Sequence, residues 1–138
     1  MGMNALPSIT LSQTLFSIIL ENLTQAQKQE IANRGLLTIK NLFTVLGIEY
    51  NTGNILNEYF TILGKYCGWF TFHYDVDENH YRLVFETELG HGWIEFLQFY
   101  IKKILQSLTV NIDNESVAGS VLIVEFNTRH KMTPCDAA

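Results

Sequence analysis

The sequence has few cysteines and no long apolar run. Cys67 and Cys135 are its only two cysteines, too few for a disulfide scaffold and typical of a reducing compartment. No apolar run approaches the ~18 residues that a transmembrane helix needs. The segment MGMNALPS has no basic residue ahead of the first apolar stretch, so it does not resemble a secretory signal. These absences predict a cytoplasmic protein without a membrane partner.

The sequence also lacks an excess of basic residues. Its formal net charge is −5. Residues 1–50 are neutral, whereas residues 51–138 carry six basic and eleven acidic side chains and hold the whole excess. Nucleic-acid binding usually leaves a basic surface, because neutralised phosphates supply most of the affinity. The composition therefore gives DNA binding only weak support and leaves a local contact as its one route.

The short motifs of common catalytic and metal sites are missing as well. The chain contains no CxxC, HxxxH, HExxH, GxGxxG, GxxxxGK or GxSxG. His73 and His80 lie on opposite limbs of a predicted hairpin, where a shared metal is one interpretation, but a solvated sheet face is the commoner reason for such a pair. Cys67 is expected in the core, and Glu86 and Glu88 on a solvated face. We therefore expect no enzyme, no catalytic residue, no metal and no cofactor.

Apolar residues are abundant for a chain of this length. They make up 47% of the 138 residues, whereas charged residues make up 17%. A chain of this size forms one domain with a real core but has limited interior to bury so much apolar material. The composition therefore favours a homodimer.

Residues 1–50 are predicted to form a dimerisation segment with two helices. SITLS (8–12) alternates apolar and polar residues and suits a short leading strand, although a segment that is helical throughout remains an alternative. TQAQ (24–27) fits a capping box with Thr24 as the N-cap. The second helix should stop at Gly47, and Gly35 either kinks or breaks it.

Residues 51–127 are predicted to form an α+β domain with an α-β-β-α-β(β) order and an antiparallel sheet. Its first helix begins at NTGN, with Thr52 or Asn54 as the cap. A hairpin follows, and a helix begins near Trp93. One or two final strands surround a DNES turn. Residues 128–138 are expected to be a flexible tail. The limits of the later elements are hairpin limbs 69–76 and 81–89, helix 93–108, and strand segments 109–113 and 116–126.

The predicted helix from Trp93 is apolar around most of its circumference. Such a helix is covered on more than one side. One cover should be the sheet of its own domain. The other should be either the N-terminal helices or a second chain.

The segment LGHGW holds the strongest local signal for a binding site. Gly90 and Gly92 flank His91 where a strand passes into a helix. Free N–H groups at a helix start can hold an anion, and an imidazole can assist. Gly90, His91, Gly92 and Trp93 are therefore the candidate ligand-binding residues. The simpler interpretation is a tight joint in which His91 is an exposed turn residue.

Aromatic residues in the hairpin offer a second possible site. They could line a small-molecule pocket, although at alternating strand spacing they are more often ordinary core. These aromatic residues are Trp69, Phe70, Phe72, Tyr74, Tyr81 and Phe85.

Two segments resemble known proteins. LGHGWIEFLQFY resembles the LGxxWSxFLxxY segment of small uncharacterised archaeal proteins, with Ile94 in place of the serine. SITLSQTLFSIILENLTQAQKQEI resembles the strand–helix–helix start of ribbon-helix-helix regulators, some of which carry an α+β partner domain. The candidate ribbon at residues 8–12 has no Lys or Arg, although a ribbon in the major groove reads bases through polar side chains.

These observations favour a non-enzymatic dimeric regulatory protein, with transcriptional regulation implied by the resemblance. The alternative is a small-molecule-binding or protein-interaction module that does not bind DNA. In the first interpretation, base contacts come from the ribbon and phosphate contacts from the following helix. The residues concerned are Ser8, Thr10 and Ser12 for the bases, and Lys28, Arg34 and Lys40 for the phosphates.

Overall fold

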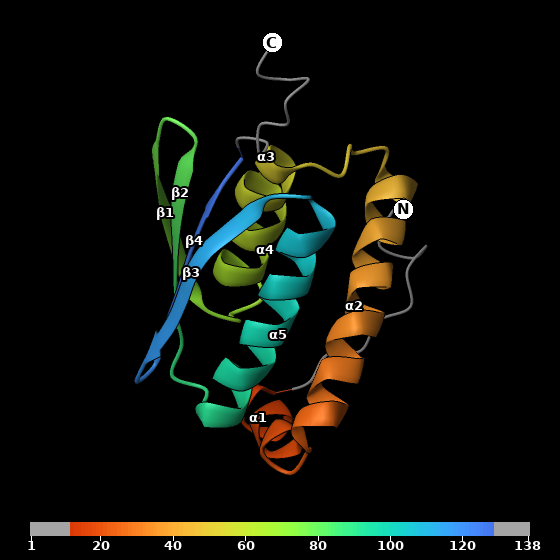
Figure 1. The fold of residues 1–138 in the computed structure, drawn as a ribbon. Coiled ribbons are helices and arrows are strands. Elements are labelled where there is room, and N and C mark those ends of the chain that lie inside the picture. The colour runs from red at the N-terminus through yellow and green to blue at the C-terminus, as the bar shows by residue number, and fades with distance from the viewer. Residues whose placement is uncertain (1–11, 129–138) are drawn as a thin grey trace.

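The computed structural model describes residues 12–128, in which a four-stranded antiparallel sheet has all of the helices on one side (Figure 1). The predicted α+β fold is confirmed. The elements in chain order are α1 (Gln13–Glu21), α2 (Gln25–Leu46), α3 (Thr52–Asn54), the π-helical turn η2 (Ile55–Tyr59), α4 (Phe60–Lys65), β1 (Thr71–Asp77), β2 (His80–Glu86), α5 (His91–Ser107), β3 (Asn111–Ala118) and β4 (Val121–Asn127).

The sheet has the strand order β1-β2-β4-β3. The predicted hairpin is present, but its strands are shorter than expected, and its turn is confined to residues 78–79. Phe72 pairs with Phe85, and Phe85 pairs with Leu122, so these three side chains line the helix-covered face. The opposite face of β1 is exposed. His73 pairs with Val84 and His80 with Asp77, so the two histidines do not face each other.

The predicted turn at DNES is wrong. Residues 113–116 lie inside β3, which is irregular between Ile112 and Asn114. The chain turns instead at Gly119 and Ser120, and Gly119 has a φ of 61°. A positive φ favours glycine over the polar residues of DNES, so the backbone reverses at the glycine.

Both N-terminal helices begin with side-chain caps. Ser12 caps α1 by accepting a hydrogen bond from the Leu15 N–H, and residues 8–11 of the predicted strand lie outside the described part of the chain. The predicted capping box at Thr24 and Gln27 is confirmed. The predicted stop at Gly47 is also confirmed, with a φ of 70°.

Gly35 neither breaks nor ends α2, which is one helix of 22 residues. A Cβ at Gly35 would lie 2.8 Å from the Cε1 atom of Tyr100 in α5. Glycine therefore allows the two helices to pack closely at this position, because a larger residue would have to displace the buried Tyr100 ring.

The segment after Asn51 forms a helix in three parts. Asn51 is its N-cap, through a 2.8 Å hydrogen bond from the Asn54 N–H, so neither Thr52 nor Asn54 has the predicted capping role. The π-helical turn η2 brings Tyr59 and Phe60 inward. Phe60 is fully buried at the centre of an aromatic cluster on the sheet.

Helix α5 lies between the sheet and α2 (Figure 1). It begins at His91, two residues before the predicted start, and Gly90 precedes it with a φ of 100°. The expected second cover is thus α2 of the same chain. Leu20 and Phe43 join the same core as α5, while a division of the chain into units at residue 50 stays a prediction. Within residues 12–128, no helix has the length and apolarity needed to cross a membrane.

Candidate functional site

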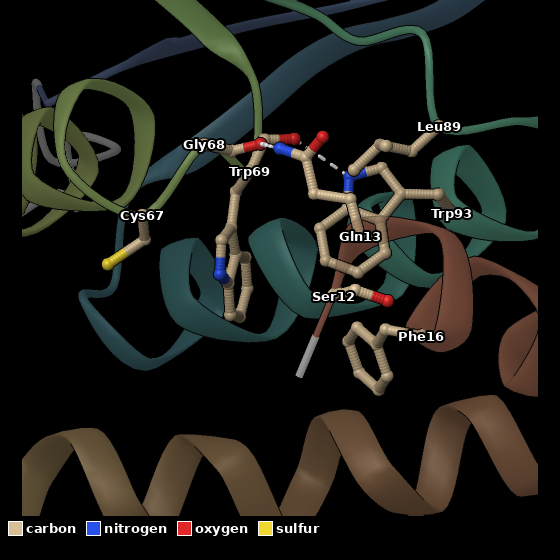
Figure 2. Close-up of a pocket in the computed structure, with 8 residues that line it drawn as sticks. All are labelled: Ser12, Gln13, Phe16, Cys67, Gly68, Trp69, Leu89 and Trp93. Carbon is tan, nitrogen blue, oxygen red and sulfur yellow. Dashed lines mark hydrogen bonds between the residues drawn. The ribbon is translucent and has the colours of Figure 1, made fainter. Parts of the chain in front are cut away.

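An aromatic pocket lies where α1, the α4–β1 loop and the start of α5 meet (Figure 2). Its volume is about 240 Å³. Among the described residues that line it, none carries a charged side chain. The lining residues are Ser12, Gln13, Phe16, Cys67, Gly68, Trp69, Leu89 and Trp93.

Two tryptophans form the fixed wall of the aromatic pocket. Trp93 is only 2% exposed, and its Nε1–H donates a 2.8 Å hydrogen bond to the Trp69 carbonyl (Figure 2). The two ring systems meet edge to face with centroids 5.2 Å apart, and the Phe16 ring lies at the same distance from Trp93. Because hydrogen bonding and packing both hold these rings, the wall is preformed.

Gln13 supplies the polar side of the aromatic pocket. Its Nε2–H donates a 2.8 Å hydrogen bond to the Gly68 carbonyl, which joins α1 to the α4–β1 loop (Figure 2). The neighbouring Cys67 is exposed and not a core residue as predicted. It follows α4, where the chain turns through Gly68 with a φ of 71°. The polar groups at this end of the pocket are therefore an amide, a carbonyl and a thiol.

The glycines of LGHGW allow α1 to approach the start of α5. The Gly92 N–H donates a 2.9 Å hydrogen bond to Oε1 of Glu21, the last residue of α1. A Cβ at Gly92 would lie 3.1 Å from the Glu21 backbone nitrogen, and one at Gly90 would lie 3.0 Å from its Oε1 atom. The Ser17 hydroxyl donates to the Leu89 carbonyl nearby. A carboxylate of the chain thus stands where the sequence predicted an external anion.

The four predicted ligand-binding residues do not converge on one cavity. Trp93 lines the aromatic pocket, whereas Gly90 and His91 line a separate hollow of about 250 Å³ beside Ser120. Gly92 is buried against α1. The His91 side chain is 78% exposed, with its Nε2 atom 3.6 Å from Glu95. His91 therefore has the geometry of the simpler interpretation, an exposed residue at a tight joint.

Lys28 does not occupy the position of a phosphate-binding residue. Its side chain is 5% exposed, and its Nζ atom lies 2.6 Å from Oε1 of Glu95 in α5. The predicted phosphate contact is corrected accordingly, because the ammonium group is buried and already has a partner in the chain. The hydrogen bond from Lys28 lowers the pKa of Glu95.

The other predicted DNA contacts are scattered. Arg34 is exposed and lies 3.5 Å from Glu30 in the same helix. The Lys40 ammonium group lies 5.5 Å from the centroid of the Tyr50 ring. Ser12 caps α1 and lines the aromatic pocket, while Ser8 and Thr10 lie outside the described residues. Among residues 12–128, these positions form no common basic surface.

Because of the Lys28–Glu95 pair, we expect the protein to lose stability in acid. The folded state lowers the pKa of Glu95 below its ordinary 4.5. The pair therefore contributes fully to the free energy of unfolding above that pH, and its contribution disappears as the pH falls through the folded-state pKa. Urea unfolding from neutral to acidic pH should show the stability gap between the wild type and Glu95→Gln narrowing in acid. A gap that stays constant across this range would contradict the prediction.

Two further polar clusters consist of side chains that contact each other. The hydroxyl groups of Tyr59 and Tyr100 lie 2.7 Å apart, and burial raises the pKa of Tyr59 to about 12. The hydroxyl therefore stays protonated at neutral pH. His80 bridges Asp113 and Glu125 on the open sheet face. Within residues 12–128, no group of three or more His, Cys, Asp or Glu side chains has an arrangement that could hold a metal ion.

Comparisons of the chain with protein-family models, curated proteins and solved structures found no match.

Proposed function

We propose that this chain is a non-enzymatic module that binds a small uncharged ligand in the aromatic pocket. The observation that carries the proposal is the lining itself. Phe16, Trp69 and Trp93 provide three aromatic faces or edges around about 240 Å³, and the hydrogen bonds of Trp93 and Gln13 hold the walls in place. Preformed, mostly apolar cavities with a few polar groups are the usual form of a small-molecule site.

The lining defines the class of ligand. A charged ligand would lose its hydration without gaining a charged partner from the described lining, which disfavours it. A cavity of roughly 150 Å³ can hold benzene, so a ring with a short substituent suits this pocket. The Gln13 amide offers one hydrogen bond to a hydroxyl or carbonyl group. The expected ligand is therefore a small neutral aromatic or alicyclic alcohol or ketone.

The described residues do not favour DNA binding. Lys28 is engaged by Glu95, and the chain has a net charge of −5. A regulatory role would then operate through the ligand and through protein contacts. This proposal corresponds to the alternative predicted from the sequence, a small-molecule-binding or protein-interaction module that does not bind DNA.

Tryptophan fluorescence gives a direct test, because Trp69 and Trp93 are the only tryptophans and both line the pocket. Benzyl alcohol is the neutral probe, and benzoate and benzylamine are charged probes of similar size. We expect benzyl alcohol to change the emission saturably and to raise the melting temperature. The two charged probes should do neither at the same concentrations.

Three variants locate the binding. Phe16→Ala should weaken benzyl alcohol binding about tenfold, the loss expected for one aromatic contact, and Phe16→Leu should weaken it less. His91→Ala is the matched control and should bind like the wild type, because His91 lies outside the pocket. Equal binding of all three probes, no saturable change, or loss of binding in His91→Ala would refute the proposal.

A further inference from the structure

A polar groove of about 510 Å³ adjoins the aromatic pocket. Gln13, Gly68 and Leu89 line both cavities, so these three residues form a shared wall (Figure 2). The groove continues from α4 to the segment after β2. Its other lining residues are Gly64, Phe70, Thr71, Glu86, Thr87 and Glu88.

The shared wall includes a hydrogen bond at the surface. The Gln13 Nε2–H donates to the Gly68 carbonyl over 2.8 Å, and this bond is exposed. A Cβ at Gly68 would lie 2.6 Å from the same nitrogen, so the missing side chain lets the amide lie directly against the loop. An exposed hydrogen bond exchanges with another of the same kind at little net cost. A ligand that replaces this bond can therefore extend from one cavity into the other.

The polar groove contains carboxylates, which the described lining of the aromatic pocket lacks. Thr71 and Glu86 are paired on β1 and β2, which places a hydroxyl beside a carboxylate. Thr87 is 6% exposed, and its hydroxyl accepts a hydrogen bond from the Leu89 N–H, which fixes the segment that carries Glu88. Within residues 12–128, the Glu86 and Glu88 carboxylates have no hydrogen-bond or ion-pair partner. A carboxylate only accepts, so an occupant of the groove must donate hydrogen bonds.

The volumes of the two cavities indicate a ligand with two parts. Sites for small molecules usually measure roughly 300–1,000 Å³. The aromatic pocket, at about 240 Å³, falls below this range, whereas the two cavities together fall within it. The polar groove also exceeds the roughly 150 Å³ that holds benzene. It therefore has room for a second six-membered ring with polar substituents.

We propose that the two cavities form one site for a neutral aromatic glycoside, with the aromatic ring in the pocket and the sugar in the polar groove. This inference rests on the proposed function, because the aromatic pocket must hold the ring. The Gln13 amide at the shared wall donates to the oxygen that links the two rings. Sugar hydroxyls donate to Glu86 and Glu88, and hydrogen bonds to an ionised acceptor are the stronger kind.

The same groove selects a sugar over a cationic tail. An ammonium group would use the two carboxylates alone, and ion pairs at an exposed position contribute little. A sugar has several hydroxyl groups, which both donate and accept, so it also uses the Thr71 hydroxyl and the Gln13 amide. The number of polar groups in the groove, more than its charge, therefore defines the ligand.

Isothermal titration calorimetry of the full chain with four probes tests the proposal. Benzyl β-D-glucoside should bind about tenfold more tightly than benzyl alcohol, the gain expected from added hydrogen bonds to carboxylates. Methyl β-D-glucoside lacks the aromatic ring and should show no saturable binding at the same concentrations. The cationic probe 3-phenylpropylamine should bind no more tightly than benzyl alcohol.

Three variants assign the two parts of the ligand to the two cavities. Phe16→Ala should weaken benzyl β-D-glucoside about tenfold, as it does benzyl alcohol. Glu86→Ala combined with Glu88→Ala should reduce the advantage of the glucoside over benzyl alcohol to less than about threefold, with benzyl alcohol binding unchanged. Glu49→Ala combined with Glu58→Ala is the matched control, because it removes two exposed acids outside both cavities. It should keep the full advantage.

The outcomes separate this inference from the proposed function. If benzyl alcohol binds but its glucoside binds no more tightly, the proposed function stands and the inference fails. The inference also fails if 3-phenylpropylamine binds as tightly as the glucoside, if Phe16→Ala leaves glucoside binding unchanged, or if the two double variants behave alike. If neither benzyl alcohol nor its glucoside binds, both proposals fail.

Circular dichroism checks that each variant is folded. If the alanine double variant at Glu86 and Glu88 is unfolded, Glu86→Gln combined with Glu88→Gln replaces it and must also reduce the advantage of the glucoside.

Discussion

Replacing Phe60 with alanine should lower the free energy of unfolding by about 3–5 kcal/mol, the usual cost of removing a fully buried phenylalanine. Phe60 is 0% exposed, and its ring centroid lies 5.4 Å from those of both Phe72 and Phe85. The substitution therefore removes contacts between α4 and the sheet and leaves a cavity between them. Urea unfolding measured by circular dichroism gives the difference directly.

Tyr66→Ala is the control for this prediction. Tyr66 follows α4 and is also aromatic, but it is 72% exposed. Its loss should change the free energy of unfolding by no more than about 0.5 kcal/mol. Equal effects of the two substitutions would mean that the aromatic cluster does not form the centre of the core.

Glu95→Leu should destabilise the protein by about 2–3 kcal/mol, because it leaves the buried Lys28 ammonium group without its partner. The value falls below that of a fully buried pair because the Glu95 side chain is 24% exposed. Adding Lys28→Met should recover most of the loss, since two apolar side chains of similar size can replace a buried ion pair at little cost. Urea unfolding of the two single variants and the double variant measures the coupling.

The double variant decides the origin of the effect. If it is no more stable than Glu95→Leu, the loss comes from the shape of the new side chain and not from the orphaned charge. Arg34→Met removes an exposed cation from the same helix, where the nearest acid is 3.5 Å away. It should change stability by less than about 0.5 kcal/mol.

Local patterns in the sequence predicted those parts of the fold that depend on neighbouring residues. The capping box at Thr24, the stop at Gly47 and the alternating hairpin are each encoded within a few positions. The same logic failed at DNES, where polar composition suggested a turn but Gly119 supplied the required backbone conformation. Composition is thus a weaker guide than the one residue that tolerates a positive φ.

The site depended on contacts between distant parts of the sequence and was predicted less well. Trp93 was expected in a binding site and lines the pocket, but Gln13 and Phe16 were missed. Phe16, the single aromatic residue in α1, was the available signal. The burial of Lys28 could not be predicted from the sequence either, because its partner Glu95 lies 67 positions away along the chain.

The joint at Gly90, His91 and Gly92 sets an unusual rule for how this segment tolerates substitution. The first position needs a φ of 100°, and at the third a Cβ would lie only 3.1 Å from the Glu21 backbone nitrogen, yet the side chain between them is 78% exposed. A mutational library should therefore keep both glycines and accept most residues in the middle. The resulting G-x-G signature would resemble part of a phosphate-binding loop, although its cause here is the docking of one helix end onto another.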